Sequence, residues 1–239
     1  ASGLACLSPE DADLGTLVLD MGGGTTSAAL FVNNGIIGSA SIPVGGLHIT
    51  RDIARILSVT ITDAERLKAV EGAITPSHGE ALIEGLSPPP FSTQGDNFIP
   101  KTNSYQIQDL MLPNGMTTDR GLLRDIIRPR VEEILDLIHQ KLVDAGLENH
   151  IGQRVVLTGG ASQLTGMADF VSQYWKRHAT VAVPKNIIGL DEHSQTPAFS
   201  ALIGMALHVI RSADDDSTDL NPAIISKTPF GRLGMWFRN

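Results

Sequence analysis

The sequence predicts an α/β fold that opens with three consecutive antiparallel strands and continues with strands that alternate with helices. Three observations predict it. An apolar run that ends at Asp20 and a second one that begins at Ala28 flank a tight turn of three glycines. The sequence Asn-Asn-Gly at 33–35 favours a hairpin between the second run and Ile36–Val44, because Asn and Gly tolerate left-handed φ angles. Further along, an apolar strand at Val155–Thr158 precedes two glycines and a helical period.

The composition bounds the class of protein. A chain of 239 residues with 42% hydrophobic content can bury the core of one large domain or two small ones. Its net charge of −8 argues against a nucleic-acid-binding surface. The one cysteine, Cys6, excludes an internal disulfide and fits a reducing cytoplasm. No apolar run reaches the length of about 18 residues that a transmembrane helix needs. The chain begins with Ala rather than Met, so we expect it to be a fragment.

The first glycine turn predicts a phosphate site. Gly22, Gly23 and Gly24 let backbone N–H groups approach a ligand closely, and Thr25 adds a hydroxyl donor. Asp20 at the strand end can hold a hydrated Mg²⁺ that neutralises phosphate oxygens. The turn lacks the Gly-Lys-Ser/Thr ending of a P-loop, and a strand follows it instead of the helix of a dinucleotide fingerprint. A glycine hairpin without any ligand is the alternative.

The second glycine turn, at Gly159 and Gly160, precedes a helix expected at roughly 164–176. The unpaired N–H groups of a helix N-terminus at this turn would favour a polar or anionic ligand. A strand at 180–183 and a helix at 198–210 complete the predicted fold. The acidic run at 214–219 is expected to be disordered.

Two helices are predicted after the antiparallel strands. Thr50 is expected to cap the first. A capping box from Thr62 to Glu65 is expected to open the second, which places Glu65 and Lys68 on one helix face. Each residue also has a purely structural interpretation: Glu65 can serve only the capping box, and Lys68 can be a solvated surface charge.

The middle of the chain, residues 72–118, is irregular and predicts a small inserted lobe. A long helical period begins at Asp119, and Pro129 is expected to break or kink it and to open a second helix. The predicted buried stripe of this period consists of Leu122, Leu123, Ile126, Ile127, Val131, Ile134, Leu135, Ile138 and Leu142.

Four arginines cluster around the predicted break, at 120, 124, 128 and 130. A solvated face is one interpretation, and a site for an acidic partner peptide is the other.

The C-terminal segment has its own amphipathic pattern. Phe230, Leu233, Trp236 and Phe237 share one helix face, and three basic residues accompany them. A short basic segment with Trp indicates a membrane-surface anchor. The alternative is a tail that packs back onto the domain.

The two glycine motifs together resemble a known superfamily. Asp-x-Gly-Gly-Gly-Thr at 20–25 is similar to the second phosphate loop of actin, Hsp70 and the sugar kinases, and Leu-Thr-Gly-Gly at 157–160 is similar to its companion. Within that superfamily the chain resembles the FtsA family of bacterial cell-division proteins. The opening Ser-Gly-Leu-Ala, Ala64-Glu65 with Lys68, Arg-Pro-Arg at 128–130 and the amphipathic tail carry this resemblance. It corresponds to the second half of an intact family member.

The resemblance implies half of an actin-like ATPase (ribonuclease H-like) fold, with a mixed sheet of three antiparallel and then parallel strands flanked by helices. Residues 12–58 and 128–210 would form subdomain 2A, and residues 59–127 a small inserted α+β subdomain, 2B. An acidic flexible linker at 211–228 would lead to an amphipathic membrane-targeting tail at 229–239.

The resemblance also implies a site for ATP and Mg²⁺ in the cleft between this half and the first half, with Asp20 near the metal. The residues carried over to the nucleotide are Gly22, Gly23, Gly24 and Thr25 for the phosphates, Glu65 and Lys68 for the ribose and base, and Gly159, Gly160 and Ser162 for the adenosine. Ser27 stands where the family commonly has Asp. We therefore expect at most weak ATPase activity from the intact protein and none from this half alone.

As a function, the resemblance implies a cell-division adaptor that links the tubulin-like protein FtsZ to the cytoplasmic face of the membrane at the septum. Subdomain 2B would receive the FtsZ C-terminal peptide, with Arg130 as a contact, and the molecules would self-associate into actin-like filaments. The alternatives are a phosphotransferase or chaperone ATPase of the same superfamily, and another actin-like scaffold such as the pilus-assembly relative. No nucleic-acid partner is expected.

Overall fold

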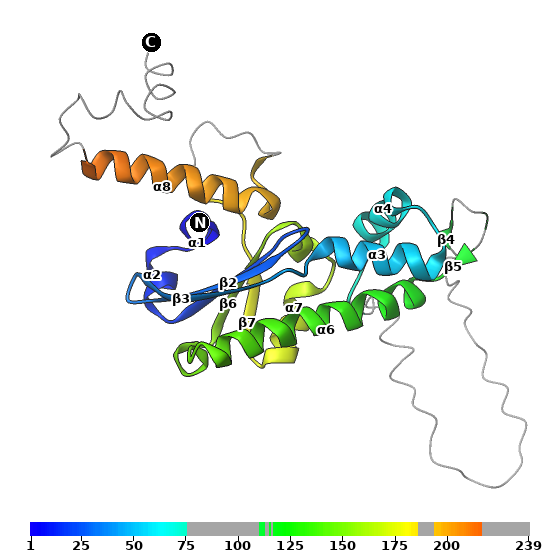
Figure 1. The fold of residues 1–239 in the computed structure, drawn as a ribbon, viewed down its shortest axis with the longest axis horizontal. Coiled ribbons are helices and arrows are strands. Elements are labelled where there is room, and N and C mark those ends of the chain that lie inside the picture. Colours follow the sequence, from blue (N-terminus) through cyan, green and yellow to red (C-terminus); the bar gives the residue numbers. More distant parts are fainter. Residues whose placement is uncertain (76–109, 113–114, 116, 186–193, 217–239) are drawn as a thin grey trace, which may run out of the picture.

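Five strands form one mixed sheet in a computed structural model that describes residues 1–75, 110–112, 115, 117–185 and 194–216 (Figure 1). The strand order is β3-β2-β1-β6-β7. In chain order the strands are β1 (Thr16–Met21), β2 (Thr26–Val32), β3 (Gly35–Ile42), β6 (Arg154–Thr158) and β7 (His178–Val181). Because β1 pairs antiparallel with β2 and parallel with β6, the expected sheet of antiparallel and then parallel strands is confirmed.

Helices cover both faces of this sheet (Figure 1). The helices α1 (Ser2–Cys6) and α8 (Ser200–Asp216) pack on one face, near α2 (Pro9–Asp13), and α6 (Arg120–Asp144) and α7 (Met167–Trp175) pack on the other. The helices α3 (Gly46–Leu57) and α4 (Ile61–Glu71) continue beyond the end of the sheet, beside the two-residue strands β4 (Leu110–Met111) and β5 (Thr117–Thr118). No helix within the described ranges is long and apolar enough to cross a membrane.

The central strand β1 is buried on both faces. Leu17, Leu19 and Met21 belong to the larger core beneath α3 and α6, while Val18 packs with Cys6 on the side of α1 and α8. The period of two along a strand sends alternate side chains to opposite faces, which explains this division. Cys6 is fully buried, and its thiol donates to Ser200 Oγ over 3.3 Å.

The hairpin predicted from Asn-Asn-Gly is confirmed. Asn33 and Asn34 adopt φ angles of 49° and 60° between β2 and β3. Two residues with positive φ match the twist of the flanking strands, so this local sequence sets their register.

The predicted helix starts are wrong by a few residues. α3 begins at Gly46, because the N–H groups of Gly46 and Leu47 donate to the carbonyls of Gly22 and Gly23 over 2.9 and 2.8 Å. Thr50 therefore lies inside α3 and is fully buried instead of capping it. The cap of α4 is Thr60, not Thr62.

The helix α6 runs through Pro129 without the predicted break. Because proline has no N–H, Pro129 leaves the carbonyl of Asp125 without its helical hydrogen bond. Pro129 and Asp125 are both exposed, so water can donate to that carbonyl instead. The predicted buried stripe is confirmed except for Leu122, which is 43% exposed.

The C-terminal part differs from the predicted element bounds. A 3₁₀ segment, η2 (Gly160–Gln163), follows the second glycine turn, and α7 begins only after Gly166, which has a φ of 81°. The helix N-terminus expected at the glycine turn is therefore not there. The strand β7 begins two residues earlier than expected, and α8 extends to Asp216, so the first six residues of the expected linker are helical.

Candidate functional site

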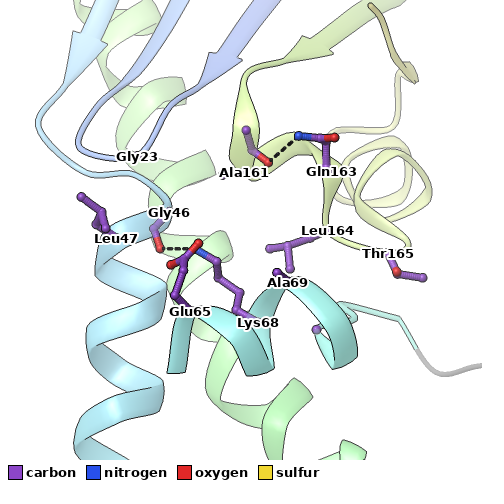
Figure 2. Close-up of a pocket in the computed structure, with 12 residues that line it drawn as sticks. Gly23, Gly46, Leu47, Glu65, Lys68, Ala69, Ala161, Gln163, Leu164 and Thr165 are labelled. Atoms are coloured by element: carbon purple, nitrogen blue, oxygen red, sulfur yellow. Dashed lines mark hydrogen bonds and ion pairs between the residues drawn. The ribbon is translucent and has the colours of Figure 1, made fainter. Parts of the chain in front are cut away.

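A pocket of about 390 Å³ lies where the first glycine turn, the start of α3, α4 and η2 meet (Figure 2). Its walls come from four elements that are far apart in the sequence. The lining residues are Gly23, Gly46, Leu47, Glu65, Lys68, Ala69, Gly72, Gly160, Ala161, Gln163, Leu164 and Thr165. Four of the predicted nucleotide residues, Gly23, Glu65, Lys68 and Gly160, thus share one cavity.

Lys68 is fixed in this pocket by three acceptors, of which Figure 2 draws Gly46 and Glu65. Its Nζ donates to the Gly46 carbonyl over 3.1 Å, to Thr50 Oγ1 over 2.9 Å and to Glu65 Oε2 over 2.8 Å. Its side chain is only 11% exposed, so the alternative of a solvated surface charge is wrong. An ammonium held by three acceptors has one orientation and can present its charge to a ligand at a fixed place.

Glu65 is oriented by the same set of contacts. Its carboxylate accepts from Lys68 and from the Thr50 hydroxyl, and its side chain is 49% exposed. Burial raises the pKa of Glu65, but the hydrogen bonds from Lys68 and Thr50 outweigh burial and hold the pKa below its ordinary value. The capping alternative for Glu65 is wrong, because Thr60 and Asp63 form the cap of α4. Glu65 is therefore an ionised acceptor at the pocket wall.

Thr50 and Gly45 belong to this arrangement and were not predicted as site residues. Thr50 joins α3 to the Glu65–Lys68 pair. A Cβ at Gly45 would lie 2.5 Å from the Gly22 carbonyl oxygen and 2.8 Å from that of Gly23. The only sequence signal for this close approach is the pair Gly45-Gly46, which indicates a tight turn without naming what it contacts.

The second glycine turn touches the first. Gly159 has a φ of 85°, and a Cβ there would lie 2.5 Å from both Asp20 Oδ1 and the Met21 carbonyl oxygen. Parallel pairing of β1 with β6 places Asp20 opposite Thr158 and explains this contact. The two turns therefore form one continuous backbone surface at the ends of the central strands.

Ser162 does not line the pocket. It is fully buried, and its hydroxyl donates to the Gly159 carbonyl over 2.7 Å. Its side chain therefore supports the second turn from behind, and Gly160 forms the pocket wall in its place.

Asp20, Gly159 and three residues of the first turn also lie outside the lining of this pocket. Asp20 Oδ2 accepts from the hydroxyl of Ser2 in α1, and Asp20 borders a different cavity that includes Ser27. Gly24 and Thr25 are exposed, and the Gly22 N–H donates to the Thr25 carbonyl over 2.9 Å. Among the described residues, no cluster of three or more His, Cys, Asp or Glu side chains could hold a metal. One carboxylate still fits a hydrated Mg²⁺, which keeps several waters and binds through one or two carboxylates plus substrate phosphates.

Comparison with known proteins decides the family. A family model described as "Cell division protein FtsA" matches residues 17–204. The chain belongs to the FtsA family. A family member from Agrobacterium fabrum, the "Cell division protein FtsA", is 36% identical over 251 residues, which cover 100% of this chain and 51% of the relative. The chain spans about half the length of the curated FtsA relatives it matches.

Two solved structures show the same fold as this FtsA-family chain. MreB5 of Spiroplasma citri bound to ADP matches with a TM-score of 0.62 and 17% identity over 92% of this chain and 60% of that one. The PilM–PilN type IV pilus biogenesis complex matches with a TM-score of 0.57 and 20% identity over 87% of this chain and 48% of that one. Both likenesses confirm an actin-like fold.

Arg130, the FtsA-type partner contact expected from the resemblance, is paired within the chain. Its Nε and Nη2 donate to the two oxygens of Asp52 over 2.6 and 3.0 Å, and its Nη1 donates to Glu133. The hydrogen bond to Asp52 raises the pKa of Arg130 further. An acidic peptide would have to compete with Asp52, which joins α3 to α6.

Two other arginines of the cluster also have acidic partners in this FtsA-family chain. Arg120 Nη2 lies 2.7 Å from Glu71 Oε2, and Arg128 Nε lies 2.9 Å from Glu132 Oε1. The Arg128 guanidinium also lies 5.3 Å from the centre of the Phe170 ring. The Arg120 and Arg128 side chains are still 45% and 53% exposed, so these ion pairs agree with a solvated face. The expected membrane residues, Phe230, Leu233, Trp236 and Phe237, lie outside the described residues.

Proposed function

We propose that this FtsA-family chain holds the adenosine part of ATP in the pocket between the Gly23 turn, α4 and η2. The observation that carries the proposal is the Glu65–Lys68 pair, which Thr50 and the Gly46 carbonyl fix at the pocket wall. The half-exposed Glu65 carboxylate can accept from ribose hydroxyls. The three N–H groups of Lys68 are all donated within the protein, so Lys68 would contribute its fixed positive charge and hold Glu65 in place. The glycine walls leave room for a flat ring. The pocket volume falls in the range of small-molecule sites.

We also propose that the phosphates extend from this pocket toward the first glycine turn. The backbone N–H groups around Gly24 and the Thr25 hydroxyl are the donors there, and Asp20 would hold Mg²⁺ through water. The metal would neutralise the phosphate charge. Ser27, where the family commonly has Asp, is hydrogen-bonded to Ser41 over 3.0 Å and supplies no second carboxylate. This favours nucleotide binding with at most weak hydrolysis in the intact protein.

Calorimetric titration of the chain with ATP, ADP and adenosine tests the nucleotide proposal. We expect saturable binding with a Kd of about 10 µM to 1 mM, because half of the site is present. Adenosine is expected to bind within about tenfold of ATP, since the contacts proposed for it above lie in this half. A folded chain that shows no saturable binding of any of the three would overturn the proposal.

At the level of the cell, we propose that the intact protein tethers FtsZ to the cytoplasmic face of the membrane at the division site. Residues 12–58 and 128–210 would act as subdomain 2A and residues 59–127 as subdomain 2B, which would receive the FtsZ C-terminal peptide beside Arg130. The tail at 229–239 would insert its apolar face into the membrane, and neighbouring molecules would self-associate. Membership of the FtsA family supports this reading over a pilus-assembly scaffold, a chaperone or a phosphotransferase.

Recruitment of a labelled FtsZ C-terminal peptide to anionic liposomes tests the tether. We expect the whole chain to carry the peptide into the liposome pellet. A chain lacking Phe230–Asn239 is expected to bind the peptide in solution and to leave it in the supernatant, because the apolar face and its Trp are removed.

The same assay separates the parts of the tether proposal. Unchanged recruitment by the truncated chain would refute the anchor, and a lack of peptide binding by both chains would refute the FtsZ contact. Arg130→Ala is expected to weaken peptide binding about tenfold, whereas Lys141→Ala, an exposed cation near the end of the same helix, serves as the matched control. Circular dichroism of both variants checks that α3 and α6 remain folded.

A further inference from the structure

A second cavity, of about 420 Å³, lies at the opposite part of the sheet from the nucleotide pocket proposed above. It is open to solvent and is bordered by the C-terminal half of α6, the 3₁₀ segment η1 (Glu148–His150) and the end of α7. None of its lining residues lines the first pocket. A ligand in this cavity would therefore contact different residues from the nucleotide.

The floor of this second cavity is apolar and one wall is aromatic. Leu17 and Leu142, each 1% exposed, contribute to the floor. Trp175 and Tyr174 come from the last turn of α7, and the Trp175 ring centre lies 6.5 Å from that of His139. Such a cavity can cover a short aliphatic stem, and the faces of the aromatic rings attract cations.

Two carboxylates border the same cavity. Asp136 Oδ1 accepts from the Tyr174 hydroxyl over 2.8 Å, and this hydrogen bond raises the pKa of Tyr174 to about 12. The phenol therefore stays neutral and holds Asp136 beside the aromatic wall. Glu148 Oε1 lies 3.7 Å from His139 Nε2 on another wall. A ligand with a positive head group would meet both carboxylates.

Arg177, the guanidinium in the lining, donates to backbone carbonyls of the protein. Arg177 Nη1 donates to the carbonyl of Ile151 over 2.7 Å and also to the carbonyl of Gly152. The lining carries two carboxylates, Asp136 and Glu148, against one guanidinium. The charge balance and the aromatic wall both favour a cationic ligand over an anionic one.

We propose that this second cavity binds a guanidinium or ammonium group on an aliphatic stem, as in an arginine or lysine side chain. The head group would lie between Asp136 and Glu148 against the face of Trp175, and the stem would cover the Leu17–Leu142 floor. Charge-assisted hydrogen bonds and a cation–π contact would supply the affinity. The chemistry fits a side chain of a partner protein and also a free polyamine.

Fluorescence of Trp175 tests this cation site in a chain that carries Trp236→Phe, which removes the other tryptophan. The probes are N-acetyl-arginine amide, the polyamine spermidine and N-acetyl-citrulline amide, a neutral isostere of the first. We expect saturable quenching by the cations and at least tenfold weaker binding of the citrulline compound. Tighter binding of the arginine amide would assign a protein side chain as the source, and tighter binding of spermidine a free polyamine.

Charge variants complete the test. Asp136→Asn and Glu148→Gln are each expected to weaken binding about tenfold, which corresponds to the loss of one charge-assisted contact. Asp144→Asn lies on the same helix but outside the lining and serves as the matched control. Equal binding of the citrulline and arginine compounds, or unchanged affinity in both folded carboxylate variants, would overturn the proposal.

Discussion

The substitution Gly159→Ala is expected to lower the free energy of unfolding by at least about 3 kcal/mol. Two effects add at this position. The φ of 85° strains any residue with a Cβ, and that Cβ would lie 2.5 Å from Asp20 Oδ1 and from the Met21 carbonyl oxygen. The Met21 backbone cannot move away without shifting β1, which pairs with β6 residue by residue. The two glycine turns would have to separate.

Urea unfolding followed by circular dichroism measures this loss, and Gly146→Ala supplies the matched control. Gly146 also has a positive φ, of 69°, but a Cβ there meets no atom within 4 Å. The control variant is therefore expected to lose only about 1 kcal/mol through backbone strain. Equal losses in both variants would contradict the close contact between the two turns.

The substitution Lys68→Met is expected to weaken ATP binding by about 10- to 100-fold and to lower the free energy of unfolding by about 1–3 kcal/mol. Methionine keeps most of the side-chain volume and removes the ammonium. The Gly46 carbonyl and the Glu65 carboxylate then lose their common donor, and Glu65 is free to change its rotamer. Calorimetry with ATP and urea unfolding measure the two effects separately.

Lys141→Met is the control for Lys68→Met, since Lys141 is exposed near the end of α6. It is expected to change stability by less than about 1 kcal/mol and to leave ATP binding unchanged. The double variant Lys68→Met, Glu65→Gln is expected to regain part of the lost stability, because it no longer leaves an ionised carboxylate without a neighbouring cation. ATP affinity in Lys68→Met equal to that of the control would argue against a role of the pair in nucleotide binding.

Features encoded by neighbouring residues could be predicted from the sequence. Asn33 and Asn34 tolerate positive φ by themselves, so the hairpin needed no information from elsewhere in the chain. Glu65 and Lys68 lie three residues apart on one helix and therefore share a face whatever surrounds them. The glycine turns carry their signal in the same local way.

Features that depend on distant partners could not be predicted. Thr50 looked like a helix cap, because nothing local shows that the Gly22 and Gly23 carbonyls would satisfy the first N–H groups of α3. The pairing of Arg130 with Asp52 joins residues 78 positions apart. Pro129 breaks a helix only where water cannot replace the lost hydrogen bond, and its exposure follows from the tertiary structure.

The central position of β1 sets an order of events during translation. Its neighbour β2, and then β3, are synthesised directly after it, but its other neighbour β6 follows only after about 130 further residues. At 5–20 residues per second this delay is roughly 6 to 26 s. Until then one edge of β1 has unpaired backbone N–H and carbonyl groups, which can pair with another nascent chain on the same messenger RNA. Protection of this early half-sheet by chaperones at the ribosome exit would therefore limit aggregation of the growing polypeptide.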